Sequence, residues 1–454
     1  MKRIIRTVLA LVLVSGCGTI RGARKAQREA GESLPAGERS LSLAEMGLTH
    51  GQMLTLGNAV DISLQWHPSM LNATQLLESA RISVRQAGVN MRPGVSSSAG
   101  FSDSHNRSNL NDWDTQSSYS MSVGLSLSWV LCDFGRTRAA QRQAAAQYIA
   151  AGESYRDAGV QRIAQVRNAY FSFARAKALC TVAEESLRQY QLLLEQAELK
   201  LKIGTGKRYD VTKASVDCSN AALSLINASN AVVTAQANLN SQLGLAEPVV
   251  FEIEPFVELP DIAGDLPYLL GVAHTNQPSM RMQNAKVNAA SAAVDMAIAN
   301  LYPSINVSAN ASYNTSHSSG GATAKSFSWG WGPSFVQSLF SGWGRTDAVR
   351  QNVTSLRIAR ANLAQQEQKI LGDLTTALAN LNAAREAKAT SEKLLGQARE
   401  NLDIVTEQFD IGMSSILERT DAQLTHTQAA ANLVTTQYAL EIAKANLYAI
   451  LGLY

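Results

Sequence analysis

The chain has 454 residues, of which 46% are hydrophobic, a fraction that supports a folded core and excludes a chain disordered throughout. It carries 40 basic and 37 acidic residues, and three of the basic ones, Lys2, Arg3 and Arg6, lie at the extreme N-terminus. The remainder is formally neutral, which argues against a nucleic-acid partner.

Residues 1–16 have the pattern of a secretory signal peptide. Basic residues precede a short apolar run from Thr7 to Val14, which is shorter than the roughly 20 residues needed to span a bilayer. The sequence Val14-Ser15-Gly16-Cys17 resembles a bacterial lipobox, and this resemblance implies that Cys17 becomes the acylated first residue of the mature chain. In lipoproteins of enteric type, an Asp directly after the acylated cysteine favours retention at the inner membrane. This chain has Gly18 at that position, so the resemblance implies delivery to the outer membrane. An ordinary signal peptide followed by a chance cysteine is the alternative.

Residues 17–52 form a polar leader after the expected lipid anchor. The leader contains a cluster of four basic residues, Arg21, Arg24, Lys25 and Arg28. This cluster could contact anionic lipid headgroups beside the anchor, or it could be a solvated segment with no partner.

An internal repeat organises the rest of the chain. The two copies share short motifs at nearly constant offsets: His67-Pro68-Ser69-Met70 with Gln277-Pro278-Ser279-Met280, Gly135-Arg136-Thr137 with Gly344-Arg345-Thr346, and Leu243-Gly244-Leu245 with Leu451-Gly452-Leu453. We therefore expect two copies of one structural unit, over residues 53–245 and 263–454. The Pro-containing segment 246–262 between them is predicted to be an extended linker.

Each copy is predicted to begin with a helix, which in the first copy runs from about Leu56 to Met91. Pro93 and its counterpart Pro303 mark the junction between this helix and the strands that follow. Apolar and small polar residues then alternate strictly from Tyr119 to Trp129, a pattern typical of a β-strand. We predict one β-hairpin in each copy, at about 95–130 and about 304–336.

A long helical hairpin completes each copy. Helical patterns of about 65 residues begin at Gly135-Arg136 and Gly344-Arg345, which are predicted to be strand-to-helix junctions. A coiled-coil spacing of apolar residues follows in both helices, at Leu187, Tyr190, Leu194, Ala197 and Leu201 and at Leu395, Ala398, Leu402, Val405 and Phe409. The chain is predicted to turn at about 204–208, with Gly204 and Gly206, and at about 412–416, with Gly412.

The strands point to an oligomer. They have the length of tilted membrane strands, and a β-segment enters lipid only when its edges are closed. One chain supplies about four strands, whereas membrane barrels start at about eight, so one chain cannot close a barrel. The aromatic residues Trp129, Phe134, Tyr302 and Trp343 fall near the strand ends, as interfacial aromatic residues do. Alternatively, the alternation of apolar and small polar residues in these strands indicates a soluble β-sandwich.

The ordered motifs resemble those of the TolC-type outer membrane factors. The set comprises Leu54-Thr55-Leu56, Ala59 and His67-Pro68, then Asp133 to Ala139 at a strand-to-helix junction, and Gly412 to Gln423 at a helical turn. The resemblance implies an α+β membrane protein that forms a homotrimer, with a 12-stranded β-barrel in the outer membrane continued by a 12-helix α-barrel in the periplasm. It implies no cofactor. The implied activity is that of a passive exit duct in a tripartite efflux pump for drugs, metals or other small molecules.

The same resemblance implies partners and site residues. The partners are a periplasmic adaptor and an inner-membrane transporter, with the lipidated N-terminus favouring the resistance-nodulation-division type over an ATP-binding cassette type. Glu418 and Asp421 match carboxylates that line the periplasmic aperture, and Asp210 matches a residue that latches the closed tip. An arginine that supports this latch in the family is absent, and Lys207 and Arg208 could substitute for it. Alternatively, Glu418 and Asp421 are solvated acids near a helix N-terminus.

Other functions fit the sequence less well. A type I protein secretion duct of the same family is the nearest alternative, and a secreted coiled-coil stalk or adhesin is a remote one, since it leaves the repeated β-hairpin unexplained. The six histidines and four cysteines show no metal-ligand spacing, and no nucleophile motif is present. The stretch Gly204-Thr205-Gly206-Lys207 lacks the first glycine and the final Ser or Thr of a phosphate-binding loop. We therefore expect no enzyme and no metal site.

Overall fold

The computed structural model describes residues 23–25, 53–107, 115–245, 248–254, 256–318, 321 and 323–453. The predicted signal peptide, the lipidation site Cys17 and nearly all of the leader lie outside these residues. The described residues fall into two compact units. The first holds residues between 78 and 150 and between 284 and 362, and the second holds those between 53 and 77, 151 and 283, and 363 and 453.

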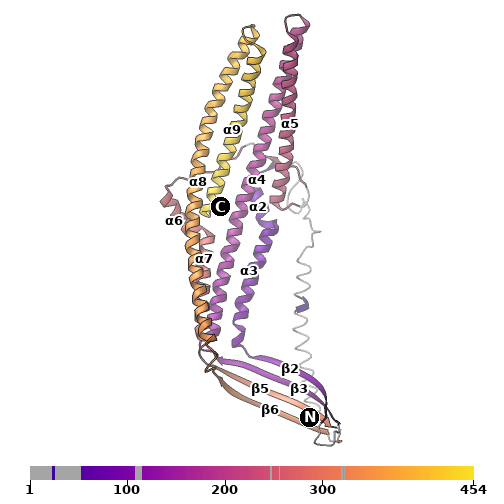
Figure 1. Ribbon diagram of the computed structural model, residues 1–454, viewed down its shortest axis with the longest axis vertical. Coiled ribbons are helices and arrows are strands. Elements are labelled where there is room, and N and C mark those ends of the chain that lie inside the picture. The colour runs from indigo at the N-terminus through magenta and orange to yellow at the C-terminus, as the bar shows by residue number, and fades with distance from the viewer. Residues whose placement is uncertain are drawn as a thin grey trace. The chain divides into compact units, whose positions relative to one another are not determined.

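The first unit contains a four-stranded antiparallel sheet in the order β2-β3-β5-β6 (Figure 1). Its strands are β2 (Gly94–Arg107), β3 (Thr115–Cys132), β5 (Ser304–Ser318) and β6 (Thr323–Val336). β2 and β3 come from the first repeat and β5 and β6 from the second, and β3 pairs with β5 to join the two hairpins. Within the described residues, β2 and β6 each have an unpaired outer edge.

The two faces of this sheet differ in chemistry. One row of directly paired residues is Val95, Leu127, Ala309 and Trp331, while the neighbouring row is Ser96, Ser126, Asn310 and Gly330. Hydroxyl pairs tie the polar face together, with Oγ to Oγ distances of 2.7 Å for Ser96 and Ser126 and 2.8 Å for Ser312 and Ser328. The apolar face is exposed in the single chain, where Val95 and Trp331 are each 72% accessible. A face of this kind needs lipid or another apolar surface to cover it.

Two long helices follow the strands. α4 (Arg136–Lys202) and α8 (Gly344–Asp410) have 67 residues each, roughly 100 Å at 1.5 Å per residue. α5 (Arg208–Leu243) and α9 (Ile416–Leu451) return alongside them, as Figure 1 shows, with 36 residues each. Among the described residues, no helix is both long and apolar enough to cross a membrane.

The helix that precedes each sheet hairpin differs from the sequence prediction. The single helix expected from Leu56 to Met91 is instead α2 (Leu56–Trp66), α3 (Pro68–Ala87) and the short 3₁₀ helix η1 (Val89–Met91). The break lies at His67, whose backbone is extended (φ −68°, ψ 132°) because the ring of Pro68 disfavours helical geometry in the preceding residue. The second repeat breaks in the same way at Gln277, between α6 (Leu266–Asn276) and α7 (Pro278–Ala299).

The predicted linker packs against the core of the second unit. A short strand in it, β4 (Glu252–Ile253), pairs in parallel with β1 (Met53–Leu54), and this pairing was not predicted. Val249, Phe251 and Leu259 are buried against an aromatic cluster of α4 that includes Tyr170 and Phe171. A second cluster packs α6 against α8 and α9 around Leu374 and Leu447. Burial of these side chains fixes the linker to the helices.

Candidate functional site

The turns of the two helical hairpins, the hairpin tips, have the same backbone geometry. Gly204 (φ 82°) and Gly412 (φ 81°) adopt the left-handed conformation that ends α4 and α8. In the first tip the N–H of Gly206 donates to the carbonyl of Lys200 at 2.8 Å, and a Cβ on Gly206 would lie 2.8 Å from the backbone nitrogen of Leu201. A side chain at Gly206 would therefore require the backbone of this turn to shift.

An acidic residue caps the returning helix at each tip. The Asp210 carboxylate accepts a hydrogen bond from the backbone N–H of Lys207 at 3.4 Å. In the second tip, the Glu418 carboxylate accepts from the backbone N–H of Ser415 and from the Ser414 hydroxyl, both at 2.7 Å. The bond from the Ser415 backbone, followed by those from the hydroxyls, lowers the pKa of Glu418. Both acids therefore satisfy backbone donors at a helix N-terminus.

Asp421 lies in a different setting from Glu418. It lines a groove of about 370 Å³ between α4, α5 and α9, together with Tyr190, Lys213 and Asp217. Lys213 forms an ion pair with Asp217 at 2.6 Å. Burial raises the pKa of the Tyr190 hydroxyl to about 12, and the carboxylates of Asp217 and Asp421 add to this shift. Within one chain, Asp421 thus faces the first hairpin and does not share the local role of Glu418.

The two hairpins contact each other through residues that the sequence did not single out as a latch. The guanidinium of Arg419, on α9, donates to the side-chain oxygen of Gln196, on α4, at 2.6 Å. The same guanidinium lies 4.9 Å from the ring centroid of Phe409, on α8, and the ammonium of Lys200, on α4, lies 3.8 Å from it. We call these four residues the tip contact. In the described chain, the proposed substitutes Lys207 and Arg208 form no ion pair.

Phe409 is the centre of this contact. It is 7% accessible and packs in a cluster with Leu193, Ala197, Ala214 and Ile416. The coiled-coil spacing placed Phe409 in the apolar seam, but nothing in that spacing indicated that two cations would lie on its ring. The one sequence feature that pointed to this contact was Arg419. It is a cation in the first turn of a helix, where an acidic residue is more favourable than a basic one.

The strand-to-helix junctions lie in the first unit. Asp133 accepts hydrogen bonds from the backbone N–H groups of Gly135 and Thr137, at 3.2 and 2.7 Å, and from the Thr137 hydroxyl. Burial by itself would raise the pKa of Asp133. The hydrogen bonds from Thr137 and Gly135 together outweigh burial and hold this pKa below its ordinary value. Gly135 has a φ of 93°, and Arg136 begins α4. These residues form the entry to the helix.

The second junction has a different construction. Gly342 stands in place of the capping Asp, α8 begins at Gly344, and the guanidinium of Arg345 donates to the carbonyl of Ser338 at 3.5 Å. Pro93 and Pro303 each lie one residue before a strand, β2 and β5 respectively.

The four aromatic residues noted in the sequence lie at the junction ends of the strands. Trp129 donates from its ring nitrogen to the carbonyl of Met91 at 3.0 Å. Phe134 stacks on Tyr302 at 6.1 Å, and Trp343 meets Phe340 edge to face at 6.3 Å.

A buried charged cluster fixes the linker to α9. Lys444 is 2% accessible, and its ammonium lies 3.2 Å from Glu441, 3.1 Å from Asp261 and 3.0 Å from the carbonyl of Leu259. Glu441, also buried, accepts from the N–H of Leu259 at 2.7 Å. The hydrogen bond from the Lys444 ammonium lowers the pKa of Asp261, against the opposing effect of burial. The sequence signal for this cluster was an acid–base pair three residues apart on an otherwise apolar helix face, and it was missed.

The described residues contain no group of three or more acidic, histidine or cysteine side chains placed to hold a metal ion. The polar side chains of the tips are instead used in caps, in the tip contact and in the groove around Tyr190. These contacts join the helices to one another and leave charged side chains at the hairpin tips.

Comparison with known proteins adds the family. Over residues 59–245 and 269–453 the chain matches the model of the outer membrane efflux protein family, one match for each repeat. It is 25% identical to protein CyaE of Bordetella pertussis, covering 82% of this chain and 78% of that protein. It is also 25% identical to the cation efflux system protein CusC of Escherichia coli, covering 84% of this chain and 82% of CusC.

A crystal structure of CusC has the same fold. It superposes with a TM-score of 0.76 at 21% sequence identity, covering 88% of this chain and 92% of that one. The two repeats, each with a sheet hairpin and a long helical hairpin, therefore have the fold of CusC, and the match of both repeats to the family model establishes that this chain belongs to the outer membrane efflux protein family.

Proposed function

We propose that three copies of this protein form the outer membrane exit duct of a tripartite efflux pump. The duct passively conducts small molecules, such as drugs or metal ions, from an inner-membrane transporter and its periplasmic adaptor to the exterior. The mature chain is anchored in the outer membrane by acyl groups on Cys17, with a large periplasmic portion. The resistance-nodulation-division type is the favoured transporter.

The observation that carries this proposal is the four-stranded sheet with two unpaired edges. One face of the sheet is apolar and the other carries serine, asparagine and glycine, as expected of a wall with lipid on one side and water on the other. The strands have 14 to 18 residues, longer than the roughly 9 to 11 that a tilted strand needs to cross the hydrocarbon. A wall of this kind is stable in lipid only when β2 of one copy pairs with β6 of the next.

The helices support the same assembly. α5 carries an exposed apolar row, Tyr209, Val216, Leu223, Ile226 and Val233, in which successive residues are three or seven apart. Each of these side chains is more than half accessible in the single chain. A heptad spacing is the pattern by which one helix packs against another along its length. A helix of a second copy would cover this row.

The names of related proteins favour efflux over protein secretion as the function of the duct. CusC is named as a cation efflux system protein, and TtgC of Pseudomonas putida as a probable efflux pump outer membrane protein. The groove around Tyr190 and the tips carry no feature that selects one cargo. Selection in such a machine then belongs to the transporter and the adaptor.

Single-channel recording in planar bilayers tests this function. With three copies, Glu418 and Asp421 would place six carboxylates around one opening, so their replacement by Ala should raise the conductance and weaken block by trivalent cations. Glu386→Ala removes one exposed carboxylate from α8, far from the tip, and should change neither quantity. Unchanged conductance and block in the Glu418→Ala/Asp421→Ala variant would remove these residues from the aperture, and a wild-type protein without channels would overturn the function.

A further inference from the structure

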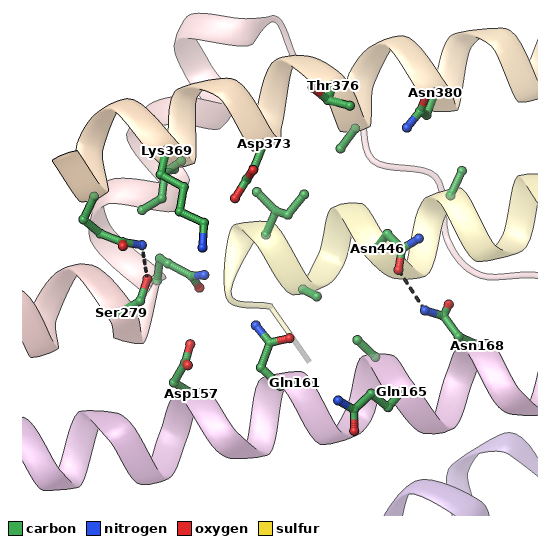
Figure 2. Close-up of a pocket in the computed structure, with 18 of the residues that line it drawn as sticks. Asp157, Gln161, Gln165, Asn168, Ser279, Lys369, Asp373, Thr376, Asn380 and Asn446 are labelled. Atoms are coloured by element: carbon green, nitrogen blue, oxygen red, sulfur yellow. Dashed lines mark hydrogen bonds between the residues drawn. The ribbon is translucent and has the colours of Figure 1, made fainter. Parts of the chain in front are cut away.

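The second unit contains a polar recess of about 660 Å³ that none of the preceding roles uses. Its walls come from α4, α8, the end of α9 and the start of α7 (Figure 2). Figure 2 shows Lys369 and Asp373 pointing from α8 toward α4, and Asp157 and Gln161 pointing from α4 toward α8. The recess therefore lies between two long helices that belong to different repeats.

The lining is polar along both long helices. Ala164, Ile370 and Ala377 also line the recess, but its polar members are Asp157, Gln161, Gln165 and Asn168 on α4 and Gln366, Lys369, Asp373, Thr376 and Asn380 on α8. The intervals between these polar residues are three or four, so each set follows one face of its helix. Apolar side chains normally occupy a row of this spacing between packed helices. Here amides and charged groups replace them over about four turns of α8.

Three oxygen atoms of the lining are buried without a hydrogen-bond partner in the described protein: Asp157 Oδ1, Asn168 Oδ1 and Gln277 Oε1. Gln277 is only 7% accessible, so its side chain is almost wholly enclosed. The Asn168 amide nitrogen already donates to Asn446 at 2.9 Å, and Gln366 donates to Ser279 at 3.0 Å. All three unmatched atoms are acceptors, and an unmatched buried acceptor is costly. A ligand that donates hydrogen bonds to these three oxygens would remove that cost.

The charges of the recess narrow the choice of ligand. Asp157 and Asp373 contribute two carboxylates against the single ammonium of Lys369, so the lining has an excess of negative charge. A bare metal ion is disfavoured because the Lys369 ammonium lies in the same recess and the volume far exceeds that of one ion. We propose that this recess binds a small hydrophilic organic amine, with ammonium groups at Asp157 and Asp373 and N–H or O–H groups at the amide oxygens.

Burial raises the pKa of Asp157, and the charge of Lys369 opposes this shift only in part. The carboxylate is thus less favourable in the recess than in water, and a cationic ligand would stabilise it. This supports an amine over a neutral sugar, which would supply donors but no positive charge.

Isothermal titration calorimetry of spermidine against the purified full-length protein tests the proposal. Asp157→Asn and Asp373→Asn should each weaken binding by about tenfold, because each removes a charge-assisted contact. Lys369→Met should strengthen binding, because it removes a repelling ammonium. Asp403→Asn removes an exposed carboxylate of α8 outside the recess and should leave the affinity unchanged.

The sign of the Lys369 effect distinguishes the ligand classes. Weaker spermidine binding in Lys369→Met, or sucrose binding that spermidine does not match, would overturn the amine in favour of a neutral ligand. Equal loss in Asp403→Asn and Asp157→Asn would show diffuse attraction to surface charge and would also overturn the site. Calorimetry does not require an open channel, so a protein that binds spermidine but conducts no current contradicts only the proposed function.

Discussion

At the scale of single residues, backbone constraints and local polar contacts determine where the helices stop, start and meet the linker. Pro68 forces the backbone of His67 out of the helix, and the His67 ring then shares a hydrogen bond with Ser69 Oγ at 2.7 Å and lies 3.0 Å from the guanidinium of Arg162. Pro68 and Pro278 were visible in the sequence at equivalent positions, yet periodicity alone favoured an unbroken helix. The geometry required by the residue before proline was the stronger constraint.

His67 should make the stability of the protein depend on pH. Burial, and then the charge of Arg162, lower the pKa of His67 below its ordinary value. The unfolded chain then binds more protons below about pH 6.5, so stability should decrease as the pH falls through that value toward the lowered pKa. Thermal unfolding at a series of pH values should show a smaller decrease in His67→Gln, which has the residue found at position 277 of the second repeat. Exposed His274→Gln is the control, and an equal change in both variants would contradict this assignment.

Lys444 should be among the most sensitive positions of the chain. Lys444→Met leaves Glu441 buried without its counter-ion, and breaking a buried pair in this way costs about 3 to 5 kcal/mol. Glu441→Gln keeps an oxygen that can accept from Leu259, so the double variant should recover much of the loss in chemical denaturation. Lys393→Met, at an exposed position of α8, should change the free energy of unfolding little. A loss below about 1 kcal/mol in Lys444→Met would show that the charged cluster does not hold the linker.

At the scale of elements, periodicity predicted the helices and strands, while pairing between distant segments remained hidden. The alternation from Tyr119 to Trp129 and the seam containing Phe409 are regular enough to read directly. In contrast, no pattern indicated that β1 (Met53–Leu54) would pair with β4 (Glu252–Ile253), because the two segments are far apart in the sequence and each is only two residues long. The cap formed by Glu418 was visible as an acid three residues after Ser415, but the tip contact depends on the spatial meeting of α4, α8 and α9.

Arg419 should stabilise the contact between the two hairpins. Arg419→Ala removes the hydrogen bond to Gln196 and one cation from the Phe409 ring, so amide hydrogen exchange near both tips should become about five to ten times faster. Arg208→Ala, at the position suggested by the sequence, should have little effect because Arg208 makes no ion pair in the described structure. Faster exchange in Arg208→Ala than in Arg419→Ala would assign the latch to the residues first predicted.

At the scale of the whole molecule, the central claim is that one chain is an incomplete wall. The sheet has four strands, unpaired edges on β2 and β6, and an exposed apolar face. The sequence predicted the number of strands and therefore the need for further copies, since membrane barrels have at least about eight strands. It could not establish that three copies are required, because two would already reach that minimum. The number three comes from the resemblance to the TolC-type factors.

Native mass spectrometry of the protein extracted from the outer membrane in mild detergent tests this claim most directly. We expect one dominant species with the mass of three chains, because the pairing of β2 with β6 of the next copy closes the wall only when all copies are present. A strictly monomeric protein that retains its fold under the same conditions would contradict the claim.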